Sequence, residues 1–451
     1  MPAVISRTGS VCPVCLRKLD AEIAVGNDGN IHMIKTCEAH GTFDVLVWEG
    51  DAVSWLLWAR EDSGCGKAPK TAVPKEKECP YSCGLCTDHQ SEGCCVLLEV
   101  TSRCSLRCPV CFASAGPSEG KDLPLEEIEK QYEWLMQHGG PYNIQLSGGE
   151  PTMRDDLDGI VRLGREKGFS YFQLNTNGLR IACEDGYAEK LKDMGISCVF
   201  LQFDGCRDEI YRKLRGRDLS DLKFRAVNRC EKAGLPVVLV PVIAPDVNEN
   251  EIGEILRFAL ERHPHVRGVH FQPLSYFGRC EVQPAAECCE DAQTQRRITI
   301  PRMLKAIEEQ SGGQMKAADF RGGGAESPYC SFHAAYRVSP DGKLKVLRKR
   351  SRSCCARPSS EAMHYVSQQW GNASPRFEAS AGSDVSSLDE FLKQAVNDTF
   401  TVSGMLFQDA WNLDLNRLKR CYICEADSEH GMVPFCAYNL TDSSGKALYR
   451  K

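Results

Sequence analysis

Three features are missing from this 451-residue sequence. Its longest apolar run, residues 235–244, is too short to cross a bilayer and contains Pro236 and Pro241. Its start, MPAVISRTGSVCPVC, lacks the basic flank and apolar stretch of a secretory signal. It has no excess of positive charge, since 55 Lys and Arg residues stand against 61 Asp and Glu residues. These absences argue against a membrane-spanning protein and against a nucleic-acid partner, and they predict a cytoplasmic location.

Cysteine, in contrast, is abundant, with 25 residues in the chain. A reducing compartment disfavours structural disulfides, so metal binding or catalysis becomes the reason to keep so many thiols. The cysteines are unevenly distributed and gather in the ranges 12–37, 79–95, 104–111 and 330–436.

Strand and helix patterns alternate between residues 96 and 290. Strands are predicted at 96–101, 143–147, 171–175, 198–203, 237–243 and 269–272, and a helix at 125–136. Six strand-helix repeats imply an α/β fold with a parallel sheet, which right-handed crossovers would curl into a barrel or partial barrel. In such a fold the functional residues lie at the carboxyl ends of the strands.

The loop after the first predicted strand holds Cys104, Cys108 and Cys111 in the spacing C-x3-C-x2-C. Three thiolates on a cluster of four irons leave one iron without a protein ligand, and that iron can chelate a substrate. A zinc site or an ordinary ferredoxin cluster would need a fourth thiolate close downstream, and the next cysteine is Cys183. The spacing therefore favours a catalytic [4Fe-4S] cluster.

The second predicted strand ends in SGGEP, residues 147–151. Together with the cysteine motif it resembles the radical S-adenosylmethionine (SAM) superfamily, in which a reduced cluster cleaves SAM to a radical that abstracts hydrogen from an unactivated carbon. The resemblance implies that the three cysteines ligate the cluster and that Phe112 packs beside the adenine. It also implies that the methionyl ammonium of SAM is received by Gly148, Gly149 and Glu150.

Two further strand ends carry polar side chains. QLNTNG places Asn175, Thr176 and Asn177 after the third strand, and LQFDG places Gln202 and Asp204 after the fourth. Such residues either reach SAM or cap the following helix. Asn175 and Gln202 are the favoured SAM contacts, with Asn177 also a candidate.

The N-terminal cysteines have the spacing of a mononuclear metal site. Cys12, Cys15 and Cys37 supply three ligands, and either His40 or Cys65 supplies the fourth, with a slight preference for Cys65. Iron and zinc are both compatible with this set. Downstream, CPYSCGLC gives Cys79, Cys83 and Cys86, and Cys94 or Cys95 could complete a four-sulfur [4Fe-4S] cluster.

The chain also resembles a narrower group, that of archaeal tetraether lipid synthase and its bacterial relatives. The resemblance rests on ECPYSCGLC, QLSGGEPTMRDDL, HFQPLSYFGR and PFCAYNL, and it runs from about residue 12 to the C-terminus. It implies a rubredoxin-like or zinc-like module at 1–70, an auxiliary cluster segment at 71–95, a partial (β/α)6 barrel at 96–290 and a C-terminal region at 291–451. A second auxiliary cluster is implied there, with ligands Cys330, Cys354 or Cys355, Cys421 and Cys436, and Cys424 as a spare.

This narrower resemblance implies hydrogen abstraction from a lipid chain followed by carbon-carbon bond formation, as in lipid biosynthesis. The alternatives are a radical SAM methylase or modifying enzyme acting on a pterin, another small molecule or a peptide, and an iron-sulfur electron carrier without a substrate. The expected partners are SAM, a lipid or small-molecule substrate and an electron donor such as flavodoxin or ferredoxin. Peripheral membrane contact is compatible with a lipid substrate, and the Ser-rich stretch 359–387 is expected to be a surface loop.

Overall fold

Six parallel strands form the centre of this computed structural model. The structure describes residues 3–60, 74, 76–117, 120–281, 297–323, 326–339, 341–347, 359–371 and 398–450. The strands lie side by side in chain order, each parallel to the next, as β5 (Cys95–Thr101), β7 (Asn143–Gly148), β8 (Phe172–Thr176), β9 (Cys198–Gln202), β10 (Val237–Val240) and β12 (Val266–Pro273). This arrangement confirms the predicted α/β partial barrel.

One predicted strand is divided in two. The pattern at 237–243 folds as β10 and the two-residue β11 (Val242–Ile243), and β11 pairs with β12. Pro241 lies between them and has no N–H to donate to a ladder, so the strand breaks there.

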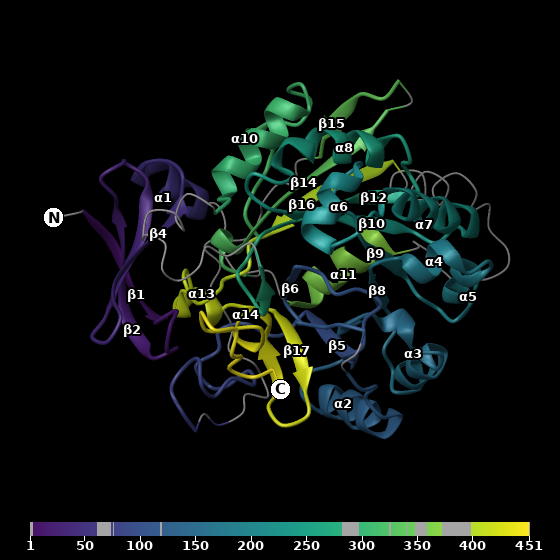
Figure 1. The fold of residues 1–451 in the computed structure, drawn as a ribbon, viewed down its shortest axis with the longest axis horizontal. Coiled ribbons are helices and arrows are strands. Elements are labelled where there is room, and N and C mark those ends of the chain that lie inside the picture. Colours follow the sequence, from purple (N-terminus) through teal and green to yellow (C-terminus); the bar gives the residue numbers. More distant parts are fainter. Residues whose placement is uncertain are drawn as a thin grey trace, which may run out of the picture.

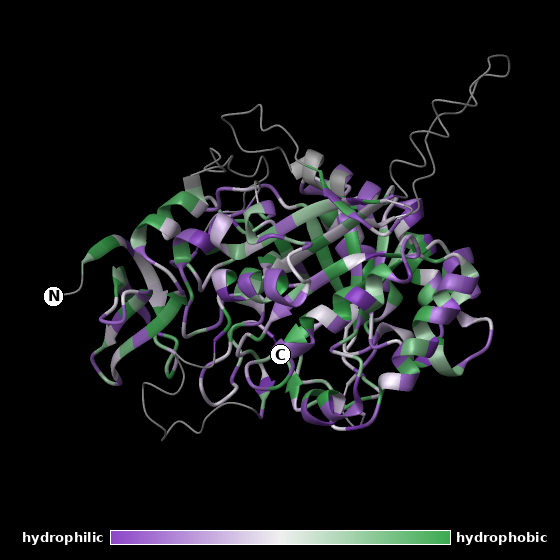
Figure 2. Cartoon of the chain, turned by 90° about the horizontal axis from the view of Figure 1, so that it is seen from above, coloured by the Kyte–Doolittle hydropathy of each residue, from purple (hydrophilic) through white to green (hydrophobic). Residues whose placement is uncertain are grey.

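Helices cover the outside of the sheet between successive strands (Figure 1). They are α2 (Leu125–Gln137), α3 (Leu157–Glu166), α4 (Leu179–Cys183), α5 (Tyr187–Asp193), α6 (Asp208–Arg215), α7 (Ser220–Ala233) and α8 (Ile252–Leu260). In α2 the buried Ile128, Tyr132 and Leu135 recur at helical spacing, so one stripe of the helix faces the sheet. The central strands are largely hydrophobic, whereas the covering helices mix both kinds of residue (Figure 2).

The C-terminal part of the chain extends this sheet at both edges. Beyond β12 lie β16 (Thr399–Met405), β14 (Ser331–Val338) and β15 (Leu344–Val346), and beyond β5 lie β17 (Ile423–Asp427) and β18 (Gly431–Pro434). β16 is parallel to β12 and β17 is parallel to β5. The boundary expected near residue 290 therefore does not coincide with a break in the sheet.

Helix α11 (Ser359–Trp370) closes the amino-terminal end of the barrel. Its Val366 and Trp370 pack on Tyr171, Phe200 and Val238, which point into the barrel. Two hydrogen bonds fix it to strand starts, from Asn143 Nδ2 to the Met363 carbonyl (3.0 Å) and from Arg267 Nε to the Gln369 carbonyl (3.3 Å). The expected surface loop is thus wrong for 359–370, because aromatic and aliphatic residues inside the Ser-rich stretch bury against the barrel; residues 372–387 lie outside the described part.

The N-terminal module is a separate antiparallel sheet followed by one helix. Its strands pair in chain order as β1 (Val4–Val11), β2 (Lys18–Val25), β3 (Ile31–Cys37) and β4 (Gly41–Trp48), and α1 (Ala52–Arg60) follows. The module lies beside the C-terminal segments of the barrel domain (Figure 1). Lys35 Nζ donates to the Ala410 carbonyl at 2.7 Å, and Thr8 Oγ1 donates to Asp414 Oδ1 at 2.6 Å.

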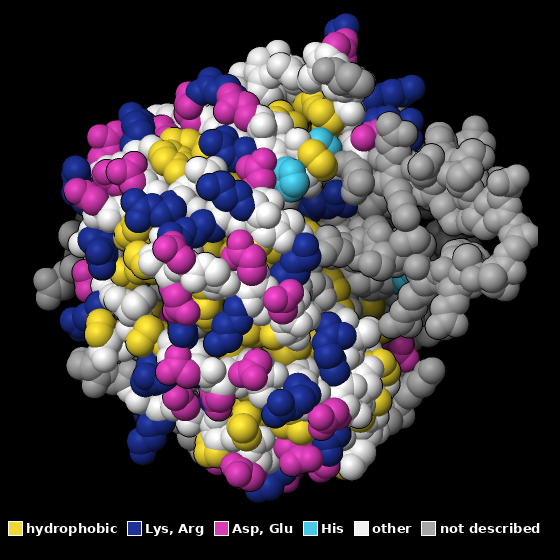
Figure 3. All heavy atoms as spheres, turned by 90° about the vertical axis from the view of Figure 1, so that its right-hand side faces the viewer, with side chains coloured by type: hydrophobic (Ala, Val, Ile, Leu, Met, Phe, Trp, Pro, Cys, Tyr) yellow, Lys and Arg dark blue, Asp and Glu magenta, His cyan; other side chains and the backbone are white. Residues whose placement is uncertain are grey.

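Short elements complete the described chain: β6 (Val110–Cys111), β13 (Arg279–Cys280), α10 (Ile300–Gln310), α13 (Leu415–Leu418), α14 (Phe435–Tyr438), η1 (Pro151–Met153), η2 (Glu249–Glu251), η3 (Ala317–Asp319) and η4 (Pro328–Cys330). Among the described helices, none has the length and hydropathy needed to cross a membrane. On the face shown in Figure 3, basic and acidic side chains of the described residues are interspersed, as the near-balanced composition predicts.

Candidate functional site

The three motif cysteines lie just beyond the carboxyl end of β5, as predicted. Cys104 and Cys108 are buried, Cys111 is half-buried, and all three line one cavity of about 300 Å³. Their loop is held by Arg279, whose Nε donates to the Cys108 carbonyl and whose Nη2 donates to the Ala115 carbonyl, both at 2.6 Å. Burial raises the pKa of the Cys104 thiol to about 12, which a bound cation would reverse by favouring the thiolate.

The spacing of these sulfurs suits a multi-iron cluster better than a single ion. Among the described residues, only one group of ligand atoms lies entirely within 4.8 Å, and it is in the N-terminal module. Cys104, Cys108 and Cys111 are therefore more widely separated than the ligands of one tetrahedral ion. Three thiolates around a wider space fit the expected [4Fe-4S] cluster with an open iron.

The cavity, called here the central cavity, occupies the barrel interior beside these cysteines. Its wall includes every residue predicted for the SAM pocket: Phe112, Gly148, Gly149, Glu150, Asn175, Asn177 and Gln202. It reaches down to Phe200, His270 and Trp370 near α11. The fold thus places the predicted strand-end residues around one space, although they come from three different strands.

Phe112 lies at the edge of the central cavity and is about a third exposed. Its ring centroid is 5.7 Å from that of Phe435, and the Arg450 guanidinium lies 5.8 Å from it on the ring face. This aromatic surface is compatible with the predicted packing against adenine.

Gly148 and Gly149 are required by the neighbouring backbone. A Cβ on Gly148, which has a φ of 125°, would lie 2.1 Å from the Thr101 carbonyl oxygen. A Cβ on Gly149 would lie 2.2 Å from the Arg103 carbonyl oxygen. The two glycines therefore allow the end of β7 to pack directly against the cysteine loop, besides lining the central cavity.

The Glu150 carboxylate is bound by the chain itself. It is 2% exposed and accepts hydrogen bonds from Thr152 N (3.1 Å), Thr152 Oγ1 (2.6 Å), Thr176 Oγ1 (2.6 Å) and Asn177 N (2.7 Å). These bonds join the ends of β7 and β8. Three of these donors bond Oε1 and one bonds Oε2, so the carboxylate is held in place by the chain, and its expected contact with the ammonium group of SAM stays a prediction.

The remaining strand-end residues line the central cavity and also bond the chain itself. Asn177 Oδ1 accepts from Leu179 N at 2.9 Å at the start of α4, and its Nδ2 donates to Ser105 Oγ of the cysteine loop at 3.2 Å. Asn175 Nδ2 donates to Gln145 Oε1 at 3.3 Å inside the barrel. Gln202 Oε1 accepts from Lys223 Nζ at 3.1 Å. Their expected contacts with SAM stay predictions.

Several site residues were not predicted from the sequence. Lys223 and Arg215 are basic residues of amphipathic helices, yet both are buried beneath the site, with exposures of 0% and 6%. Trp370 lies in a segment without a motif, and His270 begins HFQPLSYFGR, in which no role was predicted for it. Only the long-range packing of α6, α7, β12 and α11 brings these four side chains to the site.

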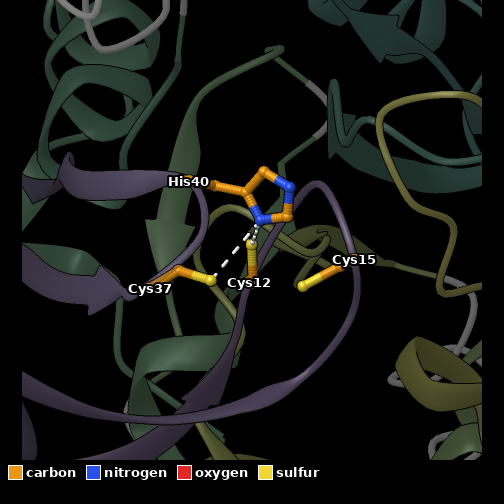
Figure 4. A group of neighbouring side chains, drawn as sticks. All are labelled: Cys12, Cys15, Cys37 and His40. Carbon is orange, nitrogen blue, oxygen red and sulfur yellow. Dashed lines mark hydrogen bonds between the residues drawn. The ribbon is translucent and has the colours of Figure 1, made fainter.

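The N-terminal module gathers Cys12, Cys15, Cys37 and His40. Their ligand atoms all lie within 4.8 Å of one another, and the side chains converge as Figure 4 shows. His40 Nδ1 is 3.5 Å from Cys12 Sγ and 3.4 Å from Cys37 Sγ. The turn between β3 and β4 folds His40 back over Cys37, so the structure favours His40 over the preferred Cys65, which lies outside the described residues. Three sulfurs and one ring nitrogen suit a tetrahedral ion such as zinc.

The predicted auxiliary cysteines occupy different surroundings. Cys79, Cys83 and Cys86 lie in one loop and line a common depression with Lys419 and Pro434, and the Cys79 and Cys83 thiols are hydrogen-bonded. Cys94 lies at the start of β5, with its sulfur 3.7 Å from that of Cys95. Its assignment as the fourth ligand stays a prediction.

The C-terminal cysteines also come together despite their separation in sequence. Burial and the neighbouring Cys330 raise the pKa of the Cys421 thiol to about 12, and both thiols influence the pKa of Cys436, which burial raises. Arg417 Nη2 donates to Cys330 Sγ at 3.4 Å. The other expected ligands, Cys354 and Cys355, lie outside the described residues.

Comparisons with known proteins agree with this arrangement. Residues 98–259 match the Radical SAM superfamily, and residues 4–49 match the HMPTM N-terminal zinc ribbon domain. The chain is 32% identical to 7,8-dihydro-6-hydroxymethylpterin dimethyltransferase of Methanocaldococcus jannaschii, over 96% of this chain and 93% of that protein. It is 27% identical to a probable GTP 3',8-cyclase of Methanothermobacter thermautotrophicus, over 56% of this chain and 84% of that protein.

Among solved structures, the chain is similar to Streptococcus suis SuiB bound to S-adenosylmethionine. The TM-score is 0.40 at 15% identity, and the match covers 50% of this chain and 48% of that one.

Proposed function

Because this chain belongs to the radical SAM superfamily, we propose that it modifies an uncharged pterin-like heterocycle, most simply by methyl transfer, in the central cavity. The observation that carries the proposal is the similarity to a pterin dimethyltransferase over nearly the whole of both chains, ribbon included. When bound, the cluster and SAM supply hydrogen-atom abstraction from an unreactive carbon. The residues of the chain must hold, orient and shield the substrate.

The inner half of the central cavity offers neutral hydrogen-bonding groups. Gln173 Nε2 donates to Asn175 Oδ1 at 2.7 Å, and Asn175 Nδ2 donates in turn to Gln145 Oε1. Trp370 also lines this cavity, and its buried Nε1 has no hydrogen-bond partner among the described residues. A flat ring with acceptor and donor atoms on its edge would satisfy such groups and pack against the aromatic wall.

The charges around the central cavity support a pterin over a nucleotide as the substrate. Among the described lining residues, the charged side chains are Glu150 and Arg215, and each is engaged by the protein itself. Burial lowers the pKa of His270 to about 4, so its ring is neutral at pH 7. A triphosphate would lack cationic partners in this wall, which favours a pterin over the substrate named for the GTP cyclase relative.

Lipid carbon-carbon coupling, expected from the narrower sequence resemblance, is less well supported. α11 closes the floor of the barrel, and an alkyl chain would leave the buried Trp370 indole N–H without a partner among the described residues. The hypothesis of a pterin-modifying enzyme, first considered as the alternative, therefore becomes the main proposal.

The chain's own residues would act as follows. Cys104, Cys108 and Cys111 hold the cluster, and Glu150 fixes the ends of β7 and β8 around SAM. Gln145 and Trp370 orient the heterocycle, while α11 keeps water from the inner half of the cavity. Flavodoxin or ferredoxin remains the predicted electron donor.

The test uses full-length protein reconstituted anaerobically with iron and sulfide, then supplied with SAM and dithionite. Ring- and side-chain-deuterated 6-hydroxymethyl-7,8-dihydropterin, GTP and a membrane-lipid extract are compared. We expect only the pterin to stimulate 5'-deoxyadenosine formation and to pass deuterium into it. Cys104→Ser is the inactive control.

A binding measurement separates recognition from turnover. Trp370→Phe keeps an aromatic ring but loses the indole donor, so pterin affinity should fall about tenfold, the usual effect of one lost hydrogen bond. Stimulation by lipid or GTP, with none by the pterin, would overturn the proposed substrate class.

A further inference from the structure

Three charged side chains are buried together beneath the cluster loop. Asp204 follows β9, Arg215 ends α6, and Lys223 lies in α7, with exposures of 0%, 6% and 0%. Arg215 Nε donates to Asp204 Oδ2 at 2.7 Å, and Arg215 Nη2 donates to Asp204 Oδ1 at 2.8 Å. Lys223 Nζ donates to the Asn177 carbonyl at 2.6 Å.

Arg215 also reaches the cysteine loop. Its Nη1 donates to the Val110 carbonyl at 3.2 Å, between Cys108 and Cys111. Arg215 and Cys108 also line the same central cavity. One buried cation thus bonds the backbone of the cysteine loop and lies in the wall that holds the predicted cluster ligands.

Asp204 holds this cation in one position. Besides the two bonds from Arg215, its Oδ1 accepts from Val242 N at 3.0 Å, so the carboxylate is anchored to β11. Burying an ion pair stabilises a protein little compared with apolar residues of similar size, because both charges lose their hydration. A role for the charge itself is therefore a better reason for this pair than stability.

The electrostatic surroundings of the three cysteines are unequal. Glu150 and Arg215 both line the central cavity with the three cysteines, and Arg215 bonds the carbonyl of Val110, which lies between Cys108 and Cys111. A donor and a positive charge at a ligand sulfur stabilise the more negative, reduced state of an iron-sulfur cluster.

We propose that Arg215, held in place by Asp204, is a positioning residue that raises the reduction potential of the catalytic cluster through its buried positive charge beside the cysteine loop and its hydrogen bond to the Val110 carbonyl. The inference depends on the cluster but not on the identity of the substrate. The cluster receives its electron from any one-electron donor. Arg215 makes and breaks no covalent bond.

The test is an electron-paramagnetic-resonance redox titration of full-length, iron- and sulfide-reconstituted protein without SAM or substrate. Other clusters could also give a signal. The signal of the catalytic cluster is therefore identified as the one that is lost in Cys104→Ser. Arg215→Gln should lower the equilibrium constant for one-electron reduction about tenfold or more, a midpoint shift of about 59 mV toward negative values. Asp204→Asn keeps the cation and removes the nearby negative charge, so it should shift the midpoint in the opposite direction.

Arg212→Gln is the matched control, because Arg212 lies on the same helix but is 61% exposed and pairs with Asp218 at the surface. Its midpoint should equal that of the wild type. An unchanged midpoint in Arg215→Gln, or shifts of the same sign in Arg215→Gln and Asp204→Asn, would overturn the proposal. If Arg215 and Asp204 had a purely structural role, the two variants would change the cluster content, but their midpoint potentials would not shift in opposite directions.

If Arg215→Gln fails to retain the cluster, the double variant Asp204→Asn/Arg215→Gln removes both buried charges together. The double variant should have a more negative midpoint potential than the wild type, because Arg215, which bonds the cysteine loop directly, is nearer to the cluster than Asp204. If that variant also loses the cluster, Asp204→Asn alone decides, and an unchanged or lowered midpoint would count against the proposal.

Discussion

At the scale of single residues, this site is built from polar side chains that are satisfied by one another. Glu150 accepts four hydrogen bonds, Asp204 accepts three through its carboxylate, and Lys223 donates to two strand ends. Such networks are rigid because each member that moved would leave a buried partner unsatisfied. Few polar groups of the described site are therefore left to bind a ligand. The indole N–H of Trp370 is one of them.

Lys223 gives a pH-dependent prediction. Burial lowers its pKa to about 8 from the ordinary 10.5, so between these values the unfolded chain binds more protons than the folded one. The free energy of unfolding should therefore rise with pH from 8 to 10.5, by up to about 1.4 kcal/mol per pH unit. Below pH 8 Lys223 is charged in both the folded and the unfolded chain, and the burial of that charge lowers the free energy of unfolding by its full amount.

Lys223→Met should lack this rise. The measurement is thermal unfolding of both proteins between pH 7 and 10. The melting temperature of the wild type, relative to that of the variant, should increase with pH. Parallel profiles would show that Lys223 does not titrate in this window.

His40 gives a second residue-scale prediction. If it is the fourth ligand in the ribbon, His40→Ala should lower metal affinity about 10- to 100-fold or more, whereas Cys65→Ser should retain one equivalent of metal. Metal content after dialysis against a weak chelator, measured by mass spectrometry, distinguishes the two. Loss of metal in Cys65→Ser alone would restore the four-sulfur alternative.

At the level of helices and strands, the strand ends carry the site residues and the helices pack against the outside of the sheet. α3 illustrates this packing. A Cβ on its Gly164 would lie 2.7 Å from Phe172 Cζ of β8 and 2.9 Å from Tyr132 Cζ of α2, whereas a Cβ on Gly159 would lie 3.9 Å from Leu125 Cδ1. One glycine is therefore required by the helix–sheet contact and the other is not.

The two glycines form a matched pair for a stability test. Gly164→Ala should destabilise the fold by about 1–3 kcal/mol through overpacking. Gly159→Ala should stabilise it by up to about 1 kcal/mol, because alanine is the better helix former. Melting temperatures of the two variants should move in opposite directions; equal shifts would contradict the packing argument.

At the scale of the whole molecule, the C-terminal segment links the modules. It supplies strands to both edges of the barrel sheet, and its residues 410 and 414 bond the ribbon module. The ribbon is also held by aromatic contacts: Tyr329 stacks on Trp55 with centroids 3.7 Å apart, and Trp58 Nε1 donates to the Pro328 carbonyl at 2.8 Å. The predicted modules are thus one connected structure within the described residues.

This contact predicts how the ribbon is attached. Tyr329→Ala removes the stacked ring and should increase proteolytic cleavage between the ribbon and the barrel about tenfold, equivalent to about 1.4 kcal/mol. Tyr329→Phe keeps the ring and should resemble the wild type. The measurement is the rate of appearance of the barrel fragment in limited proteolysis, with metal content of the ribbon followed as a control.

Local sequence patterns were sufficient to predict the alternating strands and helices, the motif cysteines after the first strand and the polar residues at the next strand ends. These features are local, because side-chain periodicity and motif spacing depend on neighbours along the chain. They were enough to predict the partial barrel and the wall of its cavity, including Asn175 and Gln202.

The partners of each polar residue could not be predicted from the sequence, because they come from segments that meet only in the folded chain. Glu150 is occupied by Thr152, Thr176 and Asn177, His40 joins the three ribbon cysteines, and a helix within the Ser-rich stretch closes the barrel floor. Arg215 and Lys223 have the sequence pattern of solvated helix residues, yet they are buried beside the cluster loop. Burial and hydrogen-bond partners arise from segments distant in sequence, so spacing alone could not assign these roles.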